Sequence, residues 1–138
     1  MKFFHLLALA VLLFFTLPVR ADGNEFLSKC SVAVASLDQS VSSDKVDSVA
    51  ELGYQFGYCM GFAQGFTGAN YTYGVLAKDK VRLMCLPDRS IKNGQALRVI
   101  VAYMKAHPEK LHLEEIILAT FAFQEAFPCS QQSTEKGK

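Results

Sequence analysis

The chemistry of this chain is most easily read from its four cysteines: Cys30, Cys59, Cys85 and Cys129. A cysteine can be a nucleophile, a metal ligand or half of a disulfide, and the spacing decides among these roles. The gaps are too wide for a zinc finger, and the chain has no Cys-x-x-Cys pair for redox work. In a small exported protein an even number of cysteines is typical of a disulfide framework, which would leave no free thiol.

Other residues that could do chemistry do not form a recognisable active site. His107 and His112 are five residues apart across Pro108, so they do not share a helical face and we predict no metal site. Ser42-Ser43-Asp44-Lys45 matches a Ser-x-x-Lys pattern, but Ser43 fits better as the cap of a helix. The glycines fall inside a helical pattern and form no phosphate-binding loop. We therefore expect a binding protein that is not an enzyme and has no cofactor.

The first 21 residues predict a cleaved signal peptide. Lys2 and His5 precede an apolar run from Leu6 to Leu17, and Val19-Arg20-Ala21 places small residues at a cleavage position before Asp22. The run is short for a membrane span. An uncleaved N-terminal anchor is the alternative. The prediction favours a bacterial periplasmic protein, although a eukaryotic secreted one stays open.

The predicted mature chain is one small domain, residues 22–129, followed by a polar tail, residues 130–138. Loss of Lys2 and Arg20 leaves 12 basic against 13 acidic residues, a net charge of −1. A charge this close to zero predicts no nucleic-acid partner and, after cleavage, no membrane partner.

The spacing of apolar residues predicts an all-α fold, a small disulfide-stapled bundle of about four helices arranged as two hairpins. We expect helices at about Phe26–Leu37, Asp44–Phe66, Asn93–Ala106 and Leu113–Phe127. Apolar residues go most of the way round the last helix, which indicates burial between neighbours or a subunit contact. Only Lys78–Leu83 comes near the pattern of a strand.

A ridge of glycines runs along the second predicted helix. Gly53, Gly57, Gly61 and Gly65 are four residues apart, and each costs about 1 kcal/mol relative to alanine inside a helix. A stripe without side chains lets another backbone approach closely, so we predict a tight helix–helix or dimer contact there. Chance spacing combined with helix curvature is the alternative.

The four cysteines allow three pairings, and the helix model favours one of them. Cys30 lies near the start of the first helix and Cys59 near the end of the second, so these two meet if the helices are antiparallel. Cys85, just before the third helix, and Cys129, just after the fourth, have the same relation. We therefore predict Cys30–Cys59 and Cys85–Cys129, each closing one helical hairpin.

The stretch Thr67–Arg82 is the best candidate for a binding surface, because it is long for a loop in a compact helical domain. It combines aromatic, amide and basic side chains, types enriched at binding hot spots or able to hydrogen-bond. They are Asn70, Tyr71, Tyr73, Lys78, Lys80 and Arg82. The alternative is an ordinary solvated loop.

Four phrases in one order resemble the Rap/Tai immunity protein family. They are Tyr58-Cys59-Met60-Gly61-Phe62, Cys85-Leu86-Pro87-Asp88, Tyr103-Met104-x-x-His107-Pro108-Glu109 and Phe127-Pro128-Cys129. The resemblance covers Phe26 to Cys129. It implies that six residues of this chain occupy framework positions of the family: Cys59, Cys85, Pro87, His107, Pro108 and Cys129. The residues that contact the toxin in the family cannot be assigned to positions of this chain, because no motif here matches them.

The resemblance implies a small helical periplasmic protein, often a homodimer. It implies protection against a peptidoglycan amidase delivered by type VI secretion, through occlusion of the toxin's active-site cleft. We therefore expect a periplasmic immunity protein whose partner is that amidase. The alternative is a small helical periplasmic chaperone or stress-response protein, which would act on several unrelated clients.

Overall fold

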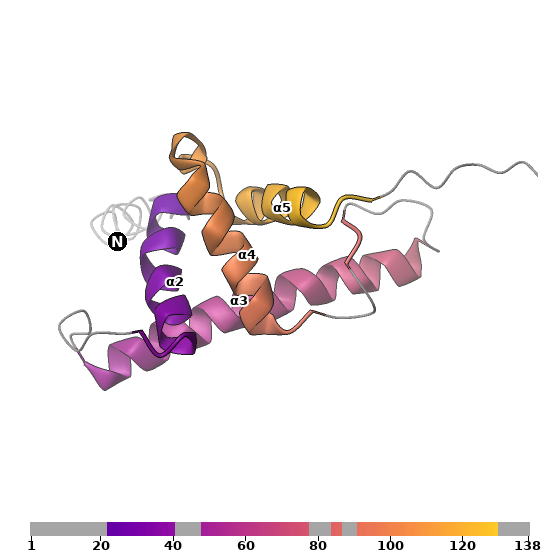
Figure 1. The fold of residues 1–138 in the computed structure, drawn as a ribbon. Helices are drawn as coiled ribbons and strands as arrows, with labels where there is room; N and C mark the ends of the chain where they lie inside the picture. Colours follow the sequence, from indigo (N-terminus) through magenta and orange to yellow (C-terminus); the bar gives the residue numbers. More distant parts are fainter. Residues whose placement is uncertain (1–21, 41–47, 78–83, 87–90, 130–138) are drawn as a thin grey trace, which may run out of the picture.

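The protein is a bundle of four α-helices in the parts of the chain that the computed structural model describes: residues 22–40, 48–77, 84–86 and 91–129. The elements are α2 (Gly23–Leu37), α3 (Val49–Leu76), α4 (Asn93–Ala106), the 3₁₀ turn η2 (Pro108–Lys110) and α5 (Glu115–Ala126). Those residues contain no strand, so the all-α prediction is confirmed. Figure 1 shows α3 as the longest rod, crossing α2 and α4 and projecting beyond them at both ends.

Helix α2 begins where the sequence places a cap. The Asp22 carboxylate accepts a hydrogen bond from the Glu25 backbone N–H at 2.9 Å, which satisfies one of the open donors of the first turn. Phe26, Cys30 and Ala33 then recur every three or four residues and are buried. This buried stripe fixes the face that α2 turns toward the rest of the bundle.

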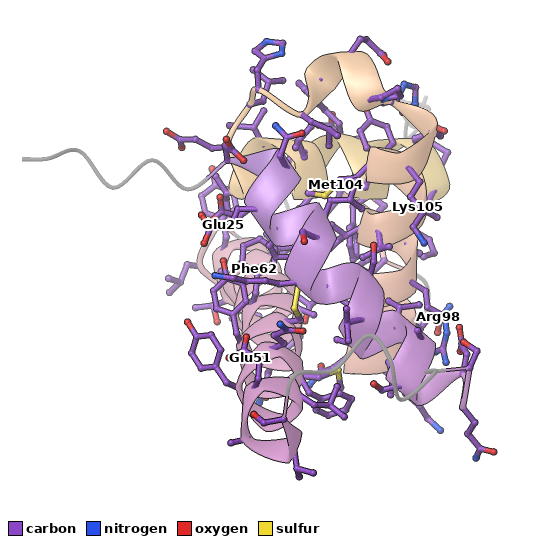
Figure 2. The ribbon with its side chains drawn as sticks, turned by 90° about the vertical axis from the view of Figure 1, so that its left-hand side faces the viewer. Glu25, Glu51, Phe62, Arg98, Met104 and Lys105 are labelled. Carbon is purple, nitrogen blue, oxygen red and sulfur yellow. A yellow bond between two sulfur atoms is a disulfide. The ribbon has the colours of Figure 1, made fainter. Side chains whose placement is uncertain are left out.

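Helix α4 packs against α2, α3 and α5. Its buried side chains include Leu97, Ile100 and Met104, each with no exposed surface. Figure 2 shows Met104 inside the bundle, whereas Lys105 points outward. The helix ends at His107, since Pro108 disfavours helical backbone in the residue before it. The predicted bounds of this helix are confirmed.

Helix α5 closes the bundle with one buried face and one exposed face. Leu118 and Phe123 are fully buried, and the Phe123 ring meets Phe66 of α3 at a centroid distance of 5.3 Å. Ile117 and Phe121, one helical turn apart, remain 41% and 38% exposed. The predicted burial between neighbours therefore holds for one face of this helix, and a subunit contact on the other face stays a prediction.

Two disulfides staple the helices, with the predicted pairing. Cys30–Cys59 joins α2 to α3 with the Cα atoms 5.6 Å apart, and Cys85–Cys129 joins the segments on either side of α4 and α5 at 4.9 Å. The arrangement that brings Cys30 and Cys59 together differs from the expected one. Cys30 and Cys59 both lie inside their helices, where α2 and α3 cross, and not at the open end of a hairpin.

The second helix ends ten residues later than predicted. The side chain of Ser48 accepts from the Glu51 N–H at 3.1 Å and caps its start, and the helix continues to Leu76. Thr67, expected to begin a loop, instead bonds back to the Ala63 carbonyl at 2.9 Å as helical threonines do. The part of the predicted loop up to Leu76 is therefore helix.

The glycine ridge lies on the exposed face of α3. A Cβ atom added at Gly53, Gly57, Gly61 or Gly65 would meet nothing within 4 Å among the described residues. No described helix of the same chain packs against the ridge, so the tight intramolecular contact predicted for it is wrong. A contact between two copies stays a prediction.

Some expectations concern residues outside the described ranges. They are the signal peptide at 1–21, the early start of the second helix at 44–47 with its cap at Ser43, the near-strand pattern at 78–83 and the tail at 130–138. Within the described ranges, none of the helices combines the length and the apolar character that crossing a bilayer requires.

Candidate functional site

The C-terminal half of α3 is an exposed part of the described bundle. No residue of α3 after Phe66 is buried. Tyr71 and Tyr73 are 63% and 47% exposed, and Val75 and Leu76 are more than half exposed as well. Large rings that project from a rigid helix lose little conformational entropy when a partner covers them, which suits a binding surface.

A first hollow of about 330 Å³, the amide hollow, lies on one side of this half of α3. Its lining combines amide groups and one exposed tyrosine with a larger apolar surface. The lining residues are Gln64, Thr67, Gly68, Asn70, Tyr71, Leu86, Ile91 and Asn93. Asn93 at the start of α4 donates to the Gln64 Oε1 at 3.4 Å, a long hydrogen bond across the hollow's edge. Side-chain amides both donate and accept, so this wall can pair with a peptide backbone.

A second hollow of about 330 Å³, the apolar hollow, lies between the same half of α3 and α5. It is lined by Phe66, Ala69, Asn70, Tyr73, Met84, Ile116 and Thr120. Asn70 belongs to both hollows, so the two flank a single helical ridge. A concave apolar surface beside convergent polar groups is the usual form of a recognition site.

The structure brings together half of the predicted binding residues. Asn70, Tyr71 and Tyr73 lie within a single turn of α3 and line the two hollows. Lys78, Lys80 and Arg82, the basic residues of the prediction, lie outside the described residues. The described part of the site is therefore aromatic and amide in character and contains no charged side chain.

Sequence reasoning missed the residues that other segments contribute. Ile91 and Asn93 precede or begin α4, while Ile116 and Thr120 come from α5. Ile116 is one of the apolar residues that go most of the way round the last predicted helix, and that pattern was the sequence signal for an apolar residue left outside the core; the structure leaves it 44% exposed. The other lining residues reach the hollows only because of how the helices pack, and no local sequence pattern predicts that packing.

The arrangement can bind but shows no means of covalent chemistry in its described part. All four cysteines are in disulfides, so no thiolate is present. No group of three or more His, Cys, Asp or Glu residues that could hold a metal occurs among the described residues. His107 caps the end of α4 and lies 3.2 Å from a Glu109 oxygen and 3.7 Å from a Glu125 oxygen, away from both hollows.

Fold and site together define a small helical domain, stapled by two disulfides, that presents a rigid aromatic ridge between two hollows. Residues 22–129 match the family model of the Rap1a immunity proteins. The match covers most of the chain, which therefore belongs to the Rap1a immunity protein family. No curated protein and no solved structure matches it.

The family resemblance expected from the sequence is thereby confirmed. The protein is an immunity protein against a secreted effector, and its partner is that effector protein. Immunity proteins of this family are generally non-enzymatic and are secreted or periplasmic.

Proposed function

We propose that the protein is exported to the periplasm through a cleaved signal peptide and there inhibits a peptidoglycan amidase delivered by type VI secretion. Inhibition would consist of tight binding that blocks the substrate cleft of the amidase. The immunity protein itself would perform no chemistry.

The observation that carries this proposal is the projecting C-terminal half of α3. Its exposed rings, Tyr71 and Tyr73, stand between two hollows on an element as stiff as a helix. A convex ridge of this kind can enter a cleft, while the hollows receive side chains from the cleft's rim. Tyrosine is among the residues that contribute most to binding energy when they are fully covered.

The proposal is tested by inhibition of purified amidases by the mature chain. Truncation of a hot-spot tyrosine costs about 2 kcal/mol or more, so if both rings are hot spots Tyr71→Ala and Tyr73→Ala should each weaken inhibition about 30-fold. Val49→Ala is the control, because Val49 is 88% exposed at the opposite end of the same helix. If both tyrosine variants inhibit as well as the control, this end of α3 does not enter the cleft.

We further propose that the protein forms a homodimer. The exposed pair Ile117 and Phe121 on α5 and the open glycine ridge of α3 are surfaces that a second copy can cover. Sedimentation velocity should show a concentration-dependent shift toward twice the monomer mass. A monomer at all concentrations up to about 1 mM, well above the Kd of specific dimers, would rule the dimer out.

The exposed apolar side chains on α5 also favour the rival function, a chaperone with several clients. A chaperone should suppress the aggregation of unrelated unfolded proteins, whereas an immunity protein should leave them unaffected and bind one enzyme in a fixed ratio.

A further inference from the structure

A third hollow lies at the other half of α3, where the first turns of α2 and α5 meet it. This acidic hollow has a volume of about 200 Å³. Three of its side chains are carboxylates, Asp22, Glu25 and Glu115, and one, Lys29, is a cation. Its described side chains therefore carry two net negative charges, one of which the α-ammonium of a mature chain beginning at Asp22 would offset.

A further carboxylate, that of Glu51, lies on the same side of the molecule as Glu25 (Figure 2). Figure 2 shows Glu25 and Glu51 on one side of the molecule and Arg98 and Lys105 on the opposite side. A localised negative field of this kind attracts a positively charged group of a partner.

Two of the three carboxylates already have partners inside the protein. Asp22 caps α2, and Glu25 lies 2.6 Å from the Lys29 ammonium. Glu115 differs from both. It is the first residue of α5, where the helix dipole favours a negative charge, and its Oε2 is buried without a hydrogen-bond donor among the described residues. Glu115 as a whole is only partly buried and lines the hollow, so a rotation of its carboxylate turns this unpaired acceptor toward a donor in the hollow.

The other walls of the hollow are aromatic. Tyr54 and Tyr58 stack with centroids 6.5 Å apart and an interplanar angle of 21°, and Phe26 lies 6.1 Å from the Tyr58 ring. The Lys29 ammonium lies 5.9 Å from the Tyr54 centroid and 5.6 Å from that of Tyr58. These distances are within the range of cation–π attraction, so the rings already face one cation and can accept another.

The charges that line the hollow also affect the pKa of Tyr58. Its burial, and next the negative charge of Glu115, raise the pKa of the phenol, while Lys29 opposes the shift. Tyr58 therefore stays neutral at physiological pH. Its ring face and hydroxyl remain available beside the carboxylate of Glu115.

We propose that the acidic hollow binds an arginine side chain of the effector protein, with the guanidinium donating to Glu115 and stacking on the tyrosine pair. A guanidinium is planar, permanently charged and able to make two parallel bonds to one carboxylate while its face lies on an aromatic ring. The volume of the hollow is several times the 30 Å³ or so that one water occupies in the liquid, which leaves room for one long side chain. The assignment of the arginine to the effector rests on the proposed function; the chemistry of the hollow does not.

The hollow itself is tested without any effector. The mature chain, beginning at Asp22, is titrated with N-acetyl-arginine methylamide and followed by two-dimensional NMR of its backbone amides. The neutral isostere N-acetyl-citrulline methylamide is the matched probe. We expect the arginine probe to shift the resonances of Tyr54, Tyr58 and Glu115, with at least tenfold weaker binding of the citrulline probe. Equal shifts with both probes, or none at these residues, would overturn the proposal.

Variants locate the interaction at one carboxylate. Glu115→Gln should reduce the affinity for the arginine probe at least tenfold. Glu114→Gln removes the neighbouring exposed carboxylate, which does not line the hollow, and should leave the affinity unchanged. Tyr58→Leu is a second variant that removes the aromatic wall and keeps Glu115. Retention of wild-type probe affinity by both Glu115→Gln and Tyr58→Leu contradicts the assignment.

The link to the effector is tested separately, by the affinity of the same variants for an amidase that the wild-type chain inhibits. We expect Glu115→Gln to weaken that complex about tenfold and Glu114→Gln to leave it unchanged. If Glu115→Gln and the wild-type chain bind the amidase with equal affinity, no arginine of the effector occupies the hollow. The proposed inhibition is unaffected by that result. If no amidase binds the wild-type chain, the proposed function fails, and the probe titration alone decides whether the hollow binds arginine.

Discussion

The exposed glycines of α3 lead to a prediction with an unusual sign: replacement of glycine by alanine should stabilise the monomer. Gly57 and Gly61 lie within a 28-residue helix, and an added Cβ at either would meet nothing within 4 Å among the described residues. Each glycine-to-alanine change in such a place contributes about 0.5–1 kcal/mol, because alanine loses less backbone entropy on folding. The double variant Gly57→Ala/Gly61→Ala should therefore gain about 1–2 kcal/mol.

The assay is urea unfolding of the mature chain, followed by circular dichroism at low micromolar concentration, where the proposed dimer would contribute least. An unchanged slope against urea would show that only stability has changed. In thermal unfolding the gain corresponds to a rise of about 4–8 °C per kcal/mol for a domain of 60–100 residues. Gly23→Ala is the control of opposite sign, since a Cβ there would clash with Leu118 and lie 3.0 Å from the Leu111 carbonyl oxygen.

The result that refutes this reasoning is a double variant less stable than the wild type at low concentration. It would mean that another backbone of the same chain packs on the ridge. Loss of stability only at high concentration has a different meaning, because it would place the ridge in a contact between two copies. The two readouts separate the folding of one chain from its self-association.

Further predictions concern the staple, the core and the acidic hollow. The double variant Cys30→Ala/Cys59→Ala opens a loop closed across 29 residues, so the free energy of unfolding should fall by about 3.6 kcal/mol in the chain-entropy model, measured by urea unfolding. Phe123→Ala empties a fully buried site and should cost about 3–5 kcal/mol in the same measurement, and a loss below 1 kcal/mol would contradict its place in the core. Tyr58 should ionise above pH 10.0 in ultraviolet titration, and Glu115→Gln should lower its pKa toward that value. Because the folded-state pKa is raised, the stability that the Tyr58 phenol contributes is complete below pH 10.0 and is lost as the pH rises through the folded-state pKa.

The helices that were predictable from the sequence are those with a buried stripe and a clear stop. In α4 the stripe of Leu97, Ile100 and Met104 and the stop at His107-Pro108 agree, and both bounds were right. The disulfide pairing was also right, because it assigned the cysteines to neighbouring helices, although the predicted place of Cys30 and Cys59 at the open end of a hairpin was wrong.

The end of α3 could not be predicted, for a physical reason. Gly65 and Gly68, followed by a run of polar and aromatic residues, have the composition of a helix end and a loop. A glycine ends a helix when it takes a positive φ, and no described glycine does so. No proline lies between Phe66 and Leu76 to stop the helix, and α3 continues without a buried residue in that stretch.

The site was predictable only in the parts that one segment supplies. Asn70, Tyr71 and Tyr73 were found from composition, although in the wrong conformation. Asn93 and Ile116 come from α4 and α5 and complete the two hollows only through packing. Glu115 directly follows Glu114 at the start of α5, and nothing in the local sequence distinguishes the carboxylate whose Oε2 becomes buried.

The central claim is inhibition of a secreted peptidoglycan amidase by tight binding, and one titration tests it most directly. The hydrolysis rate of each enzyme in a panel of type VI secreted amidases is measured while the mature chain is added in increasing molar ratio. The account predicts that the activity of the cognate enzyme falls linearly to zero at a fixed ratio, as expected when the enzyme concentration is well above Kd. Full activity of every amidase in the panel at a large molar excess of the chain would contradict it.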